Sequence, residues 1–350
     1  MPIAVSVIIP TYNCSRYVRG AVESALQQTH EVAEVIVVDD GSTDDTALQA
    51  MELEALKPGV VRYVTRQNGG VSAARMTGVE ATSSQWVALL DADDRWHSRK
   101  LALQLQAVAD TPGAGWSLSG CEVIDGNDRT MDERDPFLAT FSIFGQLGQT
   151  PAQFFESWLT KRGALDAGDR SIPLYTGDLF EPLFLGNVCL PSSALIRRDA
   201  LVQAGGFNPA LRLAEETEFF HRLAARSQVA YLAGPLVQYR KGQAGALTSG
   251  SNTVPLTRNA LESMNAAVDY RGGLTQREQQ TFRRGRANLL LYMARAQLAE
   301  HDAGGARNTL RELRRDGVAP AARLAPLIAA SLLPESALRA LLAARRALRA

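Results

Sequence analysis

The stretch Trp86-Val87-Ala88-Leu89-Leu90-Asp91-Ala92-Asp93-Asp94 joins a short apolar run to three carboxylates within four residues. An apolar run of this length is typical of a buried strand, although its periodicity alone also fits a buried helix segment. In a strand, the acids emerge at the carboxyl end, which is the edge where open α/β sheets bind ligands. Carboxylates there suit a hard divalent cation and a phosphate-bearing ligand. The same acids would also cap a following helix, so both interpretations are open at this point.

Apolar runs and amphipathic segments alternate on both sides of this stretch. The sequence predicts strands at residues 5–9, 35–38 and 60–64, the first of them ended by Pro10. Helices are predicted at about residues 15–26, from 44, from 69 to 79 and around 101–105. Strands alternating with helices indicate an α/β fold with a mostly parallel sheet flanked by helices. Right-handed crossovers would gather the strand-end acids along one edge of that sheet.

The rest of the chain divides into three regions. From about residue 125 to 185 the pattern weakens, which indicates an insertion. It is either an ordinary packed excursion or a cover over the active site that contacts a substrate. Order returns with a predicted helix at 215–225 and a short strand at 229–232, and beyond Ser251 the composition shifts to Ala, Leu and Arg. We therefore predict one α/β domain over residues 1–250, with the insertion, and an α-helical accessory region over residues 251–350.

Composition excludes several classes of protein. Lys plus Arg and Asp plus Glu both number 37, so nothing favours a nucleic-acid partner. Three distant cysteines argue against a disulfide framework, and the four histidines lack metal-ligand spacing. No basic leader precedes Val5, and no apolar run approaches the ~20 residues of a membrane helix. The sequence thus predicts a soluble cytoplasmic protein, with the inner face of the cell membrane as a second location.

The C-terminal helices have no chemical motif, and three uses are open for them. They can form a packed accessory bundle, a homodimer surface or a basic face for peripheral contact with anionic lipid. The lipid use fits the arginines near the end of the chain, Arg339, Arg345, Arg346 and Arg349. Alternatively, these arginines lie on a solvent-exposed helix face that binds no partner.

The predicted strand ends carry a set of residues suited to a nucleotide. A bound nucleotide needs an acceptor for a base N–H, a planar surface, ribose contacts and cations for its pyrophosphate. Asp40 would supply the acceptor and Tyr12 the surface. Asp91 would contact the ribose, and Arg75 would act with a metal on Asp93 at the pyrophosphate. Each residue alone also fits a turn or a cap, because segments such as Asp-Asp-Gly-Ser are common turn sequences.

Four motifs together resemble the successive signatures of glycosyltransferase family 2, of the bacterial cell-surface glycan type. They are Ser6-Val7-Ile8-Ile9-Pro10-Thr11-Tyr12-Asn13, Val37-Val38-Asp39-Asp40-Gly41-Ser42-Thr43-Asp44, Gln67-Asn68-Gly69-Gly70-Val71-Ser72-Ala73-Ala74-Arg75 and Leu89-Leu90-Asp91-Ala92-Asp93-Asp94. The resemblance extends from about Val5 to Arg240, without the insertion. It implies an inverting enzyme with the GT-A fold, a Rossmann-like α/β architecture.

The resemblance also implies roles for individual residues. Asp40 corresponds to the residue that pairs with uracil, and Tyr12 to the one that packs on that ring. Asp91 and Asp93 correspond to the acids of the Asp-X-Asp motif, which contact the ribose and a Mn²⁺ or Mg²⁺ ion. The implied donor nucleotide-binding set is Pro10, Tyr12, Asp40, Asn68, Arg75 and Asp91, and the implied metal ligand is Asp93.

The catalytic base departs from the family pattern. The family usually places an Asp after a Glu at a helix start that follows a Gly-Gly-Phe turn, and here Glu215-Glu216 follows Gly205-Gly206-Phe207. By position Glu216 is the base, with Glu215 as an accessory acid. Acids in a first helical turn also complement the helix dipole, which is the alternative explanation.

A second departure concerns the metal or diphosphate. Relatives often have His three residues after the Tyr of a Tyr-Arg pair, and that position is Gly242 here. Arg240 would then be an accessory cation.

The predicted function is transfer of a sugar from a UDP-sugar to a hydroxyl of a glycan or lipid-linked acceptor, with metal assistance and inversion. The alternative is a catalytically weak nucleotide-sugar-binding or scaffold subunit of a glycan assembly complex, motivated by the two departures. A nucleotidyltransferase is disfavoured, because no Gly-rich phosphate loop with its Lys or Arg follows the first strand.

Overall fold

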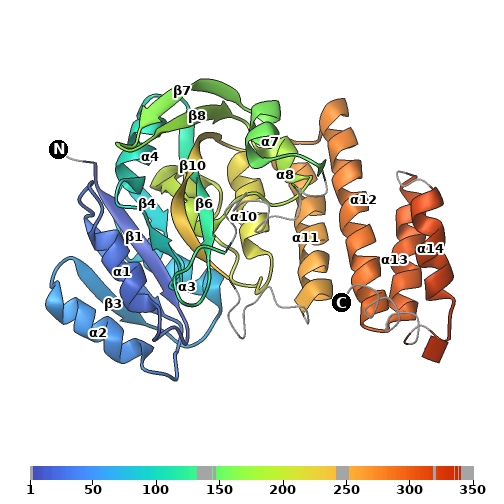
Figure 1. Cartoon of the computed structure of the whole chain (residues 1–350), viewed down its shortest axis with the longest axis horizontal. Coiled ribbons are helices and arrows are strands. Elements are labelled where there is room, and N and C mark those ends of the chain that lie inside the picture. Colours follow the sequence, from blue (N-terminus) through green and yellow to red (C-terminus); the bar gives the residue numbers. More distant parts are fainter. Residues whose placement is uncertain are drawn as a thin grey trace. The chain divides into compact units, whose positions relative to one another are not determined.

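A computed structural model describes residues 3–131, 144, 147–241, 252–317, 321–334, 336, 337 and 339. The chain divides into two compact units, which are coloured along the sequence in Figure 1. The first unit contains Met1–Leu183 and Asn187–Ala244, and the second contains Phe184–Gly186 and Gly245–Ala350. The domain boundary predicted near Ser251 lies outside the described residues.

The first unit is built on a ten-stranded sheet with the order β3-β2-β1-β4-β9-β6-β10-β8-β7, and β5 pairs with β10. The strands are β1 Val5–Thr11, β2 Glu34–Asp39, β3 Val61–Thr65, β4 Trp86–Leu89, β5 Arg95–Trp96, β6 Ala114–Ile124, β7 Thr160–Asp166, β8 Ser171–Gly177, β9 Leu195–Arg197 and β10 Gln228–Arg240.

The half of the sheet formed by β3-β2-β1-β4 is parallel, and it confirms the strands predicted there. β1 and β4 are buried at every residue, because helices cover both faces of a parallel sheet and leave no polar side. The prediction that Pro10 ends the first strand is wrong. Pro10 pairs with Val38 of β2 inside β1, while the ladder between β1 and β4 already ends at Ile8. The missing N–H of Pro10 therefore breaks no ladder bond.

The other half of the sheet is mixed, so the prediction of a mostly parallel sheet holds only for the first half. β9 pairs antiparallel with both β4 and β6, and β6 pairs parallel with β10. β10 extends well beyond the predicted strand at residues 229–232, with register shifts between Leu232 and Val237. These irregularities accommodate Pro235, which cannot complete a regular ladder.

Helices flank the sheet in the first unit (Figure 1). They are α1 Val18–Leu26, α2 Thr46–Leu56, α3 Val71–Glu80, α4 Lys100–Ala109, α7 Pro151–Trp158, α8 Phe180–Leu183, α9 Arg198–Gln203 and α10 Glu215–Ala224, with a 3₁₀ turn, η1, at Pro191–Ser193. Within the predicted insertion, residues Pro151–Trp158 form α7. The hairpin of β7 and β8 extends the sheet beyond β10, which the sequence did not indicate.

The described part of the second unit is largely helical, as predicted. Its helices are α11 Thr253–Ala267, α12 Gln276–Ala299, α13 Ala303–Arg315 and α14 Ala321–Ser331, with a 3₁₀ turn, η3, at Val268–Arg271. α12 and α13 begin with side-chain caps from Thr275 and Asp302. Among the described residues no helix has the length and apolar character needed to cross a membrane.

Gly78 allows α3 to pack directly on the sheet, which sets the position of the Asn68–Gly70 loop. A Cβ atom added at Gly78 would lie 2.4 Å from Cγ2 of Ile8 and 3.3 Å from Cγ2 of Val38. We expect Gly78→Ala to lower the free energy of unfolding by about 1–3 kcal/mol, because a packed interface must then move apart. Urea denaturation measures this change.

The control for this prediction is a double-mutant cycle with Ile8→Ala, which removes the atoms that the new methyl group would meet. The double variant should lose less stability than the sum of the two single variants. Additive losses would contradict the close contact between Gly78 and Ile8.

Candidate active site

The predicted site residues lie at the carboxyl ends of the parallel strands. β1, β2 and β4 are adjacent and run in the same direction, so the residues that follow them reach the same edge. Tyr12 follows β1, Asp40 follows β2, and Asp91 and Asp93 follow β4. This edge is where open α/β sheets bind their ligands.

The three acids after β4 differ in burial. Asp91 and Asp93 are partly exposed, whereas Asp94 is 1% exposed. Asp94 accepts hydrogen bonds from Ser192 Oγ at 2.5 Å and from the Arg240 amide at 2.9 Å. Burial, followed by the charges of Asp93 and Asp91, raises the pKa of Asp94 well above its usual value. Asp94 therefore holds the turn from inside, and the other two carboxylates are accessible from outside.

Ser192 is a residue of this site that sequence reasoning missed. Its hydroxyl accepts a hydrogen bond from the Asp91 amide at 3.0 Å and donates to Asp94. It therefore joins both ends of the segment Asp91–Asp94, which we call the acidic turn. Trp96 Nε1 in turn donates to the Ser192 carbonyl at 2.7 Å. About a hundred residues separate Ser192 from the turn, and no local pattern indicates such a contact.

Arg75 lies between the acidic turn and the start of α10. Its side chain is 3% exposed and donates to Asp91 Oδ1 at 2.8 Å and to Glu215 Oε1 at 3.2 Å. The guanidinium also lies 5.1 Å from the centre of the Phe207 ring. Burial acts to lower the pKa of Arg75, but the Asp91 and Glu215 carboxylates outweigh it and raise the pKa. Arg75 thus connects two carboxylates, and a direct contact with pyrophosphate stays a prediction.

Glu216 follows this ion pair in the first turn of α10. Burial and the charge of Glu215 raise the pKa of Glu216 to about 8, although Arg75 acts in the opposite direction. A carboxyl group with such a pKa is suited to accept a proton near neutral pH. The residue before the helix, Ala214, has a left-handed backbone with φ of 58°, a strained conformation that recurs at functional sites.

The turn that precedes α10 is anchored by Arg222. This side chain pairs with Glu218 one helical turn earlier and donates to the carbonyls of Ala204 and Gly206. Gly206 has a φ of 65°, and Phe207 stacks on Phe219 with ring centres 4.0 Å apart. The Gly-Gly-Phe turn and α10 are therefore fixed to each other, which sets the position of Glu216.

The residues predicted to bind the base differ in accessibility. Tyr12 is 49% exposed, as a surface for a planar ring must be. The Asp40 side chain is 4% exposed and accepts hydrogen bonds from Arg66 and from the amides of Gly69 and Gly70. Asp40 thus holds the loop that opens α3, and its contact with a base stays a prediction.

Two further predicted donor-binding residues lie beside this loop. Asn68 Oδ1 accepts a hydrogen bond from Arg212 at 3.3 Å, which brings the segment before α10 to the loop. Pro10 is buried inside β1, so it supports the site from within the sheet.

Arg240 has a structural environment. Its Nε donates to the Asp93 carbonyl at 2.8 Å and its Nη1 to the Asp125 carbonyl at 2.5 Å, while Nη2 pairs with Asp128 at 2.5 Å. All three guanidinium nitrogens thus have protein partners, and Arg240 fixes the backbone at Asp93. The neighbouring Lys241 is partly buried, 5.9 Å from the centre of the Tyr239 ring.

His221 lies further along α10 and is 1% exposed. Burial lowers the pKa of His221 to about 4, so the ring is neutral at pH 7. Its position inside the protein is that of a structural residue.

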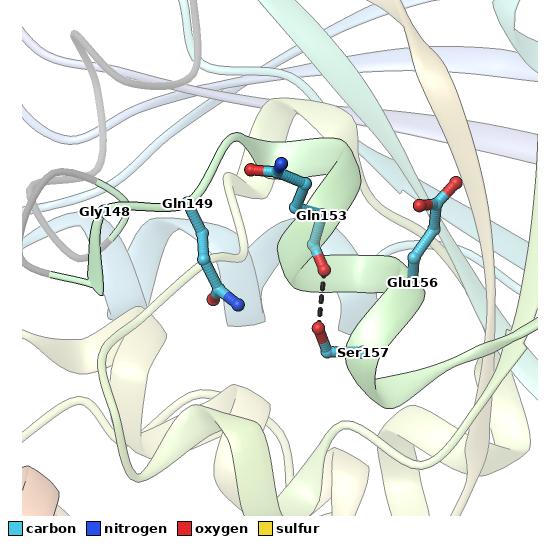
Figure 2. Close-up of a pocket in the computed structure, with 5 residues that line it drawn as sticks. All are labelled: Gly148, Gln149, Gln153, Glu156 and Ser157. Carbon is cyan, nitrogen blue, oxygen red and sulfur yellow. Dashed lines mark hydrogen bonds between the residues drawn. The ribbon is translucent and has the colours of Figure 1, made fainter.

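A separate polar depression lies on α7 and the residues before it (Figure 2). Its lining residues are Gly148, Gln149, Gln153, Glu156 and Ser157, and its volume is about 440 Å³. The Ser157 hydroxyl donates to the Gln153 carbonyl, and Glu156 accepts a hydrogen bond from Tyr175 at 2.7 Å. None of the predicted site residues lines this depression.

Comparison with known proteins assigns the chain to a protein family. The sequence model described as Glycosyl transferase family 2 matches residues 6–203, more than half of the chain. An uncharacterised glycosyltransferase of Nostoc sp. is 37% identical over 129 residues. That match covers 37% of this chain and 40% of the relative, so the chain spans less than half of that protein.

Two solved structures share the fold. Staphylococcus aureus TarS 1-349 in complex with UDP-GlcNAc has a TM-score of 0.53 and 16% identity, covering 89% of this chain and 90% of that one. The mannosyltransferase PcManGT of Pyrobaculum calidifontis, in complex with GDP-Man and Mn²⁺, has a TM-score of 0.55 and 19% identity, covering 97% and 79%. These likenesses confirm the predicted GT-A fold.

The raised pKa of Glu216 predicts a pH-dependent cost in stability. The folded protein holds the proton of Glu216 up to about pH 8, whereas an unfolded glutamic acid releases it near pH 4.5. Stability is therefore lost as pH rises between these values. Glu216→Gln removes this ionisation, so the variant should exceed the wild-type protein in free energy of unfolding at pH 9 and match it more closely at pH 5.

The comparison variant is Glu218→Gln, which breaks the ion pair with Arg222. This change should destabilise the protein at both pH values, because it leaves a partly buried arginine without its carboxylate. A Glu216→Gln protein that is equally or less stable than wild type at pH 9 would contradict the raised pKa of Glu216.

Proposed function

The chain belongs to glycosyltransferase family 2, and on that basis we propose that it transfers a hexose-type sugar from a UDP-sugar to a hydroxyl of a glycan or lipid-linked acceptor, with inversion. The observation that carries the proposal is the pairing of Arg75 with both Asp91 and Glu215. Through Arg75, the pairing brings together Asp91, which is predicted to bind the sugar donor, and Glu215, which precedes the predicted base. The UDP-sugar and the acceptor hydroxyl would thus be bound next to each other.

In the proposed reaction Glu216 accepts the proton of the acceptor hydroxyl. The acceptor oxygen attacks the anomeric carbon of the sugar as the bond from that carbon to the diphosphate oxygen breaks. UDP leaves with the bonding electron pair, and direct displacement inverts the anomeric centre. A carboxylate one methylene longer than the usual aspartate remains a competent base, and the raised pKa of Glu216 matches it to this task.

The acidic turn fits a divalent metal that is shared with the donor. Asp93 offers the hard oxygen ligand that Mn²⁺ and Mg²⁺ prefer, and Asp91 stays the predicted ribose contact. Among the described residues no three His, Cys, Asp or Glu side chains form a complete metal site. This is expected where a cation takes one or two carboxylates and completes its coordination with phosphate and water. When bound, the cation would stabilise the charge on the leaving diphosphate.

Uridine is the proposed nucleoside of the donor, and a hydroxyl of a glycan or lipid-linked molecule is the proposed acceptor. The TarS structure holds UDP-GlcNAc and the PcManGT structure holds GDP-Man, so this fold accommodates more than one nucleotide. Calorimetric titration with UDP-sugars and GDP-sugars, with and without Mn²⁺, tests this choice. Tighter binding of a GDP-sugar would overturn the assignment of uridine.

Glu216→Gln should lower kcat for transfer by roughly 10²–10⁴-fold with little change in donor affinity, because it removes the proton acceptor. In the wild-type enzyme kcat/KM should rise with pH, reach half its maximum near pH 8, where half of Glu216 is ionised, and level off above that pH. Exposed Glu23, changed to Gln, serves as the matched control and should leave both quantities unchanged. Wild-type rates in the Glu216→Gln protein would exclude Glu216 as the base.

Asp93→Asn should weaken the binding of the metal. We expect the Mn²⁺ concentration for half-maximal activity to rise about tenfold or more, because a neutral amide replaces a charged ligand. Asp94→Asn is the informative comparison, because Asp94 faces inward and should mainly lower stability. UDP binding without turnover of any donor in the wild-type protein would favour the alternative, a nucleotide-sugar-binding subunit.

A further inference from the structure

The zero net charge of the chain conceals a division between its two parts. Residues 1–244 contain 21 Lys and Arg against 29 Asp and Glu, which gives a formal charge of −8. Residues 245–350 contain 16 Arg, no Lys and 8 Asp and Glu, which gives +8. A positive excess of this size on about a hundred residues favours association with an anionic surface.

Part of this excess is exposed at the end of α13. Arg311, Arg314 and Arg315 are exposed there, while Leu310 and Leu313 of the same helix are buried. The acids nearest to them, Glu312 and Asp316, are both paired with Arg286 of α12. Within the described part of the chain, neither Arg314 nor Arg315 forms an ion pair. Their charges are thus left to face solvent.

From Leu324 to Ala330, the next helix, α14, is apolar on all sides. No charged residue occurs from Leu324 to Pro334. On the inner side, Leu327, Ala330 and Leu333 pack against the cluster of Leu298 and Ala306. A helix that is apolar on every side is normally enclosed by protein or lipid.

The outer side of α14 is not enclosed by the described residues. Ala325 and Ala329 are exposed, and Leu332, directly after the helix, is 67% exposed. The spacing of these three positions by four and three residues places them on one side, which we call the α14 outer face. Ile328 lies at its margin and is partly exposed.

The arginines and the α14 outer face belong to neighbouring helices. α13 and α14 lie side by side in Figure 1, and Arg307 Nη1 of α13 donates to the Ser331 carbonyl of α14 at 2.5 Å. The bond joins the first half of α13 to the end of α14, so the two helices run antiparallel. The basic end of α13 is therefore beside the start of α14, only residues 316–320 away along the chain.

We infer that the α14 outer face, together with Arg311, Arg314 and Arg315, binds the surface of an anionic lipid bilayer. Apolar side chains would enter the boundary between headgroups and acyl chains, and the guanidinium groups would pair with lipid phosphates. An eleven-residue helix is too short to span the hydrocarbon core, so the contact is peripheral. A second copy of the chain is a less suitable occupant, because pairing through α14 would bring two units of charge +8 together.

Vesicle sedimentation with the full-length chain tests this inference. Vesicles of equal parts phosphatidylglycerol and phosphatidylcholine should bind the protein, whereas pure phosphatidylcholine should bind it at least about tenfold more weakly. Binding should fall as NaCl rises from about 50 mM to about 500 mM, because salt screens the arginines. Equal binding to both kinds of vesicle would overturn the role of the arginines.

Two variants distinguish the contribution of the α14 outer face to vesicle binding from that of the arginines. Leu332→Glu places a charge on the α14 outer face, and the triple variant Arg311→Ser/Arg314→Ser/Arg315→Ser removes the basic end of α13. Each should reduce binding about tenfold or more. The matched controls in the first unit are Val202→Glu, at an apolar residue that is 59% exposed, and the double variant Arg162→Ser/Arg226→Ser. Both controls should bind vesicles as the wild-type protein does.

Unchanged binding of both test variants would overturn the inference. Absence of vesicle binding by the wild-type protein, with a dimer in sedimentation that Leu332→Glu abolishes, would assign the face to a second copy instead. Vesicle binding does not depend on sugar transfer, so its failure is distinct from failure of the proposed function. Hydrolysis of a UDP-sugar in solution should be unchanged in Leu332→Glu, which also shows that the variant is folded.

Discussion

The arrangement of the site depends on one buried cation. Arg75 is almost fully enclosed and has carboxylates on two sides, Asp91 after β4 and Glu215 at the start of α10. Charges removed from water are costly unless each has a partner, so loss of Arg75 would leave the buried Glu215 carboxylate without its cation. The ion pairs therefore join α3 and the turn after β4 to the start of α10, which lies far from both in the sequence. If the segment carrying Glu216 moved away from the acidic turn, the ion pair between Arg75 and Glu215 would break.

A second set of buried contacts sorts the acids after β4 into two kinds. Ser192 and the Arg240 amide satisfy Asp94 from the interior, and the Arg240 side chain binds the Asp93 carbonyl. With the inner acid and the backbone held in this way, the outer carboxylates can face a ligand without the turn having to reorganise. The support comes from η1, which directly precedes β9, and from β10, and both strands belong to the mixed half of the sheet. The mixed half of the sheet carries none of the four family motifs, yet it supports the geometry of the site directly.

The secondary structure was predictable where a local pattern sufficed. β1, β2 and β4 are enclosed on both faces, so their sequences are continuous apolar runs. α12 and α13 begin at Thr275 and Asp302, which cap them. The short β9, the hairpin of β7 and β8, and the passage of β1 through Pro10 were not predictable in this way. Each depends on which strand lies alongside, and such pairing leaves little trace in a local window.

The sequence by itself determined the fold class and the order of polar residues along the sheet edge, because strand ends and turn residues are local features. It also determined the division of charge between the two parts of the chain. Only the tertiary structure decided how those polar residues are used. Asp40 and Arg240 are chemically able to meet a nucleotide, yet the fold surrounds them with partners from distant segments. Burial and neighbouring charge, which raise the pKa of Glu216, likewise arise only when α10 is packed in place.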